Sequence, residues 1–116
     1  MNTAKILPSR IRICLAAMMV AAAPQAQAQV PLSSYTDARG YVDVQSLTCA
    51  QLAGTFQEDA DYLAAWYSGW YNGLAKRHFA HIVRVKSGEH QLIVYCKAHP
   101  DLKIIQAIDI LLKNEK

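Results

Sequence analysis

Apolar and polar positions follow a helical pattern most clearly between residues 58 and 74. Apolar side chains recur there every three or four residues, the spacing of one face of an α-helix: Leu63, Trp66, Tyr67, Trp70 and Leu74. Acidic residues crowd the start of the segment, where negative charge suits the positive end of a helix dipole: Glu58, Asp59 and Asp61. Gly73 suits the other end as a cap. The pattern predicts an amphipathic helix that ends near Gly73.

Two shorter helices are predicted from local signals. Thr48 and Gln51 have the spacing of a capping box, in which a hydroxyl and an amide side chain satisfy free backbone amides. They predict a helix over about 48–55. Another helix is predicted to begin at 87–89 and to stop near Pro100. One face of it carries Leu92, Ile93 and Cys96.

A fourth helix is predicted from residue 100 to about 113. Its apolar side chains keep helical spacing: Ile104, Ile105, Ile108, Leu111 and Leu112. Basic and apolar residues partly alternate over 76–86, which we interpret as a short strand-like crossing or a loop. No internal repeat is present. Four short helices predict an all-α fold, a small single-domain bundle.

The first 28 residues have the organisation of a secretory signal peptide. Basic residues come first: Lys5, Arg10 and Arg12. An apolar run over 11–23 and the small-residue exit at 26–28 follow. The run of roughly 13 residues is shorter than the roughly 20 that a transmembrane helix needs. We therefore expect cleavage after Ala28, export of the mature chain, and no stable membrane insertion of it.

Removal of this leader changes the charge of the protein. The whole chain has 12 Lys and Arg against 9 Asp and Glu, a net charge of +3, but three of the bases and none of the acids lie in the leader. The mature chain is then formally neutral, which argues against nucleic acid as a partner. Its length allows one small domain. We expect a mobile arm over 29–45 and the helical domain over 46–116.

Two cysteines remain after cleavage, Cys49 and Cys96. They allow one intramolecular pairing, and export would place them where disulfides persist. A bridge over this span is worth about 4 kcal/mol in the chain-entropy model. An intermolecular bridge or a metal pair are the alternatives, although a metal needs more ligands than two distant thiols.

No group of residues in the sequence predicts catalysis. His78 and His81 are three apart, but no third ligand stands at a motif spacing, so no metal site is expected. The carboxylates cluster at helix starts, where capping explains them. Glycine-rich phosphate loops are absent from the sequence, and both thiols are expected to be oxidised. We expect no enzyme activity and no cofactor.

Aromatic side chains are concentrated in the long helix. Two Trp and three Tyr lie between Tyr62 and Tyr71. A helical stripe of this kind is usually core, but this number exceeds what one face of so small a domain hides easily. Burial in the core and use as an oligomer or client-binding surface both remain open.

Four features in order along the chain resemble the HdeA/HdeB family of periplasmic acid-stress chaperones, and its HdeA-like branch in particular. They are the signal peptide, the helix start Thr48-Cys49, the block from Ala65 to Gly73, and the segment from Val94 to Asp101. The resemblance extends from about Val42 to Leu112. It departs from the family at 76–86, where relatives more often have a shorter and less basic link.

The resemblance implies a helical protein with one disulfide that is a dimer, and inactive, near neutral pH. In acid such proteins loosen, hold acid-denatured periplasmic proteins in solution without ATP, and release them on neutralisation. Cys49 and Cys96 match the disulfide of the family. The helix that would supply the dimer interface or the client-binding surface contains Leu63, Trp66, Tyr67 and Trp70.

Two functional hypotheses follow. The first is an acid-activated, ATP-independent holdase that exposes apolar surface at low pH. The second is an envelope binding protein, such as an immunity protein or a hydrolase inhibitor, in which the aromatic stripe and the basic segment 76–86 form a fixed docking surface.

Overall fold

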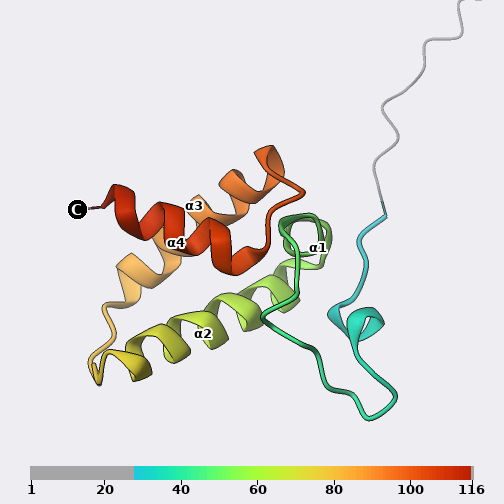
Figure 1. The fold of residues 1–116 in the computed structure, drawn as a ribbon, viewed down its shortest axis with the longest axis horizontal. Helices are drawn as coiled ribbons and strands as arrows, with labels where there is room; N and C mark the ends of the chain where they lie inside the picture. Colours follow the sequence, from blue (N-terminus) through green and yellow to red (C-terminus); the bar gives the residue numbers. More distant parts are fainter. Residues whose placement is uncertain (1–27, 116) are drawn as a thin grey trace, which may run out of the picture.

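The computed structural model describes residues 28–115 (Figure 1). The signal peptide that we predict therefore lies, except for its last residue, outside the described residues. The elements in chain order are a 3-10 helix η1 (Leu32–Tyr35) and the helices α1 (Cys49–Gly54), α2 (Gln57–Leu74), α3 (Ile82–Ala98) and α4 (Ile104–Asn114). Residues 28–115 contain no β-strand. The predicted all-α fold of four helices is confirmed.

The core lies where the short α1 meets the three longer helices. Helix α1 contacts α2, α3 and α4, and α3 contacts all three other helices. Leu47 and apolar residues from all four α-helices are buried there: Cys49, Leu52, Ala60, Leu63, Tyr67, Leu92, Cys96, Ile104 and Ala107. None of the helices within 28–115 is long and apolar enough to cross a membrane.

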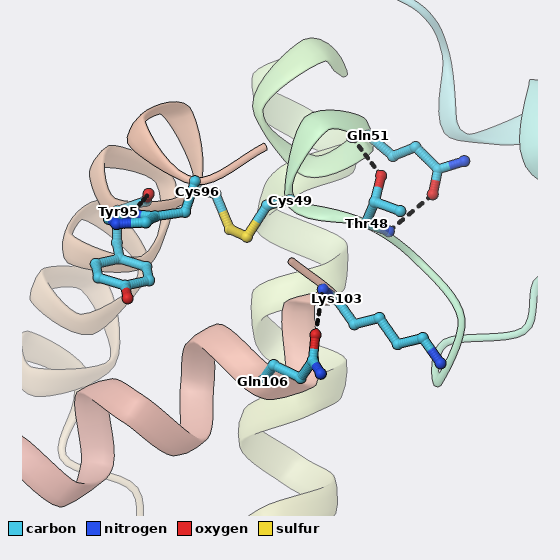
Figure 2. Close-up of a disulfide and its surroundings, with 8 residues drawn as sticks. Thr48, Cys49, Gln51, Tyr95, Cys96, Lys103 and Gln106 are labelled. Atoms are coloured by element: carbon cyan, nitrogen blue, oxygen red, sulfur yellow. Dashed lines mark hydrogen bonds between the residues drawn. A yellow bond between two sulfur atoms is a disulfide. The ribbon is translucent and has the colours of Figure 1, made fainter. Parts of the chain in front are cut away.

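The predicted disulfide joins α1 to α3 (Figure 2). Cys49 and Cys96 are bonded with their Cα atoms 4.5 Å apart, and both are completely buried. The intramolecular pairing is confirmed, and the metal pair and the intermolecular bridge are excluded.

Helix α1 begins as its capping box predicts. The backbone amide of Gln51 donates to Thr48 Oγ1 at 3.2 Å, and the amide of Thr48 donates to Gln51 Oε1 at 2.9 Å (Figure 2). The turn between α3 and α4 satisfies two further amides of α1. Cys49 N donates to Leu102 O at 2.7 Å, and Ala50 N donates to Pro100 O at 3.1 Å. The first turn of α1 is thus held from two sides.

Two helix starts differ from our prediction. Helix α3 begins at Ile82, five residues before the predicted start, so the interpretation of 82–86 as a crossing or a loop was wrong. The side chain of His81 acts as the cap, because its Nδ1 accepts a hydrogen bond from Arg84 N at 3.3 Å. Helix α4 begins at Ile104 rather than at residue 100, because 100–102 form the turn that caps α1.

Helix α2 ends close to the predicted position, but Gly73 is not its cap. The helix passes Gly73 and ends at Leu74, and Lys76 takes the left-handed conformation with φ of 54°. Lys76 N donates to Gly73 O at 3.0 Å, and Arg77 N donates to Asn72 O at 2.8 Å. This pair of bonds is a Schellman motif, in which the left-handed position is usually a glycine.

The arm over 29–45 is bonded to the helices at three points. Val30 N donates to Gly54 O at 2.9 Å, and Leu32 N donates to Asp59 Oδ2 at 2.9 Å. The hydroxyl of Tyr67 donates to the carbonyl of Val44. Apolar side chains of the arm pack on the core: Leu32, Tyr35, Val42 and Val44. The arm covers apolar residues of the helices in this conformation, while its mobility and the domain boundaries stay predictions.

Candidate interaction surface

The apolar face predicted for α2 consists of two neighbouring rows of side chains. The buried row contains Ala60, Leu63 and Tyr67, all of them in the core. The exposed row contains Tyr62, Trp66 and Trp70, which follow one another at intervals of four residues. The Trp66 side chain is 47% exposed, and that of Trp70 is partly buried. One row stabilises the fold, and the other presents aromatic surface to solvent.

The two rows are in contact through their rings. The ring centroids of Trp66 and Trp70 are 5.5 Å apart and their planes are tilted by 44°. Trp66 also meets the edge of Tyr67 at 5.5 Å, and Trp70 lies 5.5 Å from Tyr71. Aromatic pairs favour such tilted and edge-on geometries. The exposed row therefore rests on the core and is held in place by it.

The predicted site residues are divided between surface and interior. Trp66 and Trp70 belong to the exposed row, whereas Leu63 and Tyr67 are in the core and reach a partner only if the core opens. Burial raises the pKa of the Tyr67 hydroxyl, so this hydroxyl stays protonated and continues to donate to Val44 O. Their role in binding a client or a second copy stays a prediction.

Sequence reasoning named the basic segment 76–86 as part of a possible docking surface, but it missed a second exposed apolar region among these bases. It lies at the junction between α2 and α3, where four large apolar side chains are exposed: Leu74, Phe79, Ile82 and Val83. Four exposed bases lie among them: Lys76, Arg77, Arg84 and Lys86. We call these eight residues the junction patch. The sequence carried a signal for it, because Ile82 and Val83 are adjacent in the chain, and adjacent residues of a helix cannot both point into the protein core.

A groove of about 370 Å³ separates α2, α3 and α4 beside this patch. Its walls include Tyr67, Leu92 and Ile108, and Arg77 and Arg84 also line it. Arg84 Nη2 lies 3.9 Å from Glu115 Oε2, the one ion pair in the part of the chain that the structure describes. Within residues 28–115 no group of three or more His, Cys, Asp or Glu side chains could hold a metal ion.

A pair of carboxyl groups joins α2 to α3. Gln57 Nε2 donates to Asp61 Oδ1 at 2.8 Å and to Glu89 Oε1 at 3.1 Å. Burial, followed by the hydrogen bond with Asp61 and the charge of that residue, raises the pKa of Glu89 to about 7. The hydrogen bond with Glu89, helped by Gln57 and by the charge of Lys86, lowers the pKa of Asp61. The pair thus holds one shared proton in mild acid.

This pair predicts a pH dependence of stability. Because the folded pKa of Glu89 lies above its ordinary value, the stability it contributes is present in mild acid and is lost as the pH rises through about 7. We expect Glu89→Gln, which keeps a donor beside Asp61 without the charge, to reduce the fall in melting temperature between about pH 5 and pH 8. Thermal unfolding followed by circular dichroism measures that fall.

The control for this prediction is Glu58→Gln, which removes an exposed carboxyl from the first turn of α2, the helix that carries Asp61. It should lower the melting temperature by a similar amount at each pH, so that the fall in melting temperature between about pH 5 and pH 8 is unchanged. If Glu89→Gln shows the same fall in melting temperature with pH as the unchanged protein, the assignment of the proton to this pair is contradicted.

The fold and the surface define a class of protein: a small helical domain, closed by one disulfide, with exposed aromatic and apolar side chains. The family model of the HdeA/HdeB family matches residues 11–106 of this chain, so the chain belongs to the HdeA/HdeB family. Members are non-enzymatic acid-stress chaperones of the periplasm, which confirms the prediction that the protein is not an enzyme. No curated protein and no solved structure matches the chain significantly.

Proposed function

We propose that this protein is a periplasmic, acid-activated and ATP-independent holdase of the HdeA-like branch. It would be exported with cleavage after Ala28 and would form a homodimer near neutral pH. The observation that carries the proposal is the exposed aromatic row of α2, which rests directly on the buried row of the core. A protein with this arrangement can enlarge its apolar surface by loosening rather than by full unfolding.

Acid acts first on the charge of the molecule. Below about pH 3 the nine carboxyls lose most of their charge, while the mature chain keeps nine Lys and Arg, four His and its amino terminus, roughly +14 in all. Repulsion among these charges opposes both the compact state and association. A dimer that is favoured at neutral charge would then dissociate.

Acid acts next on the arm. Four backbone amides of the arm donate to carboxylates: Leu32 N to Asp59, Arg39 N and Tyr41 N to Asp37, and Gln45 N to Asp43. Hydrogen bonds to a charged acceptor are stronger than neutral ones, so protonation of these carboxylates weakens the contacts that shape and hold the arm. Release of the arm would remove its apolar side chains from the core and free Tyr67, which bonds to Val44 O, beside the exposed row.

The experiment that tests the proposal is light scattering of a periplasmic protein during denaturation between about pH 2 and pH 4, below the reference carboxyl pKa values. We expect this protein to suppress aggregation there and to be inactive at pH 7. Trp66→Ala should raise the concentration needed for half suppression by about tenfold, as expected when an aromatic anchor is removed.

The matched control is Val94→Ala, which shortens an exposed apolar side chain of α3 outside both exposed regions. It should leave the suppression unchanged. Aggregation that is unaffected by the protein at every pH would refute the holdase, and one stoichiometric partner retained at pH 7 would favour the envelope binding protein.

A further inference from the structure

The junction patch combines two properties that rarely occur together on a small soluble domain. Its apolar members are strongly exposed, with Phe79 at 85% and Val83 at 72%. Its four bases are only partly balanced: Arg84 pairs with Glu115 and Lys86 lies near Asp61, while the sequence contains no acidic residue between Asp61 and Glu89. The formally neutral mature chain therefore carries a basic region with an apolar surface inside it.

The position of the patch suits contact with an extended surface. The loop between α2 and α3 lies at the end of the helical domain away from α1 and from the arm (Figure 1). The Schellman motif at Lys76 fixes one end of the loop, and the His81 cap fixes the other. Between them, the rings of His78 and Phe79 lie 4.4 Å apart. The exposed side chains are thus presented by two anchored helix ends.

The chemistry of the patch identifies its partner. A free anion would be held by the bases and would leave Phe79, Ile82 and Val83 in water, whereas a purely apolar ligand would make no use of the bases. An anionic lipid surface satisfies both, since apolar side chains enter the headgroup region while Lys and Arg meet lipid phosphates. We propose that the junction patch binds the surface of a membrane that contains anionic phospholipids.

The backbone at Lys76 supports this proposal independently. The left-handed conformation with φ of 54° favours glycine, because a side chain is strained there. This chain instead places a long basic side chain at the edge of the patch. A side chain at a strained backbone position is expected where that side chain has a function. The function that Lys76 can supply here is its positive charge.

The distribution of acids would orient the bound protein. Acidic residues concentrate in the arm and in the first turn of α2: Asp37, Asp43, Glu58 and Asp59. This region lies at the other end of the domain from the junction patch (Figure 1). An anionic surface repels it while attracting the patch, so the arm and α1 would point away from the membrane.

The test is co-sedimentation of the folded, disulfide-bonded protein with lipid vesicles at pH 7. We expect binding to vesicles that contain phosphatidylglycerol to be at least about tenfold tighter than to vesicles of phosphatidylcholine alone. The binding should weaken when the salt concentration is raised from about 0.05 M to about 0.5 M.

Two variants locate the binding. Lys76→Gln together with Lys86→Gln should weaken it by about 25-fold, roughly fivefold for each charge removed near the surface. Phe79→Ser together with Val83→Ser should weaken it at constant charge. The matched control is Lys97→Gln together with Lys103→Gln, which removes the same charge from the last turn of α3 and the start of α4, on the side of α1, and should have little effect. Circular dichroism checks that each variant is folded.

Two results would overturn the proposal: equal affinity for both kinds of vesicle, or equal loss in the control and in the Lys76 and Lys86 variant. Failure to bind any vesicle would also overturn it and leave the patch to protein partners. The membrane proposal does not rest on the holdase. The same variants should also be measured in the aggregation assay. A protein can suppress aggregation without binding vesicles, and it can bind vesicles without suppressing aggregation, so the two proposals can fail separately.

Discussion

Replacement of Cys49 by serine is expected to lower the free energy of unfolding by about 4 kcal/mol. The bridge closes a loop with a sequence separation of 47, and loss of that constraint enlarges the unfolded ensemble by this amount in the chain-entropy model. Both cysteines are completely buried, so the variant also leaves a hydroxyl and a thiol in the core. Urea denaturation at pH 7 measures the loss.

The same substitution separates structure from function. In acid the bridge limits how far the charged chain can expand, and it keeps α1 joined to α3 while apolar surface is exposed. We therefore expect Cys49→Ser to reduce suppression of aggregation more than it reduces helix content at pH 7. Cys96→Ser is the matched variant and should behave in the same way, because either change breaks the same bond. Equal losses of helix content and of suppression would mean that the bridge is only structural.

The second large effect is expected from Ile104→Ala, which should lower the free energy of unfolding by roughly 3 to 5 kcal/mol. Ile104 is fully buried at the start of α4, and its amide donates to Leu47 O at 2.9 Å. The substitution leaves a cavity beside α1, where the α3–α4 turn caps Cys49 and Ala50. Little relaxation is possible there, because the disulfide and these backbone bonds hold the walls of the site.

The control for this effect is Leu112→Ala on the same helix. The Leu112 side chain is exposed, so its removal should cost less than about 1 kcal/mol. Both variants keep the Leu47 backbone bond, since alanine retains its amide. Thermal and urea unfolding compare them, and similar losses in the two variants would contradict the assignment of Ile104 to the centre of the core.

Features determined by few residues could be predicted from the sequence. The capping box needs only Thr48, Gln51 and the helix between them, and two remaining cysteines leave one internal pairing. The existence of α2 and α4 also followed from the periodicity of their apolar residues. These predictions succeeded because each depends on local spacing or on a small number of alternatives.

Features determined by contacts between helices could not be predicted in this way. The start of α3 was placed too late, because His81 is an unusual cap and Ser87-Gly88 resembles a helix start. The start of α4 was placed too early, because Pro100 and Leu102 are used to cap α1 instead. Each of these helix boundaries is decided by a hydrogen bond, and the local sequence pattern does not reveal the partner in that bond.

The candidate surface was predicted only in part for the same reason. Periodicity placed Leu63, Trp66, Tyr67 and Trp70 on one face, and all four do lie on adjacent rows of α2. Their separation into a buried and an exposed row follows from where the arm, α1 and α3 pack. The apolar face of an amphipathic helix is wider than the part of the helix surface that a small core can cover.

The arrangement of the exposed row has an optical consequence. The protein contains two tryptophans, and both stand in this row with ring centroids 5.5 Å apart. All of its tryptophan emission therefore originates at the surface proposed to bind clients. Indole rings this close also couple their electronic transitions, which gives the folded protein a near-ultraviolet dichroism that disappears when they separate. Without any attached dye, a spectrometer can follow the opening of this surface and the arrival of a client on it.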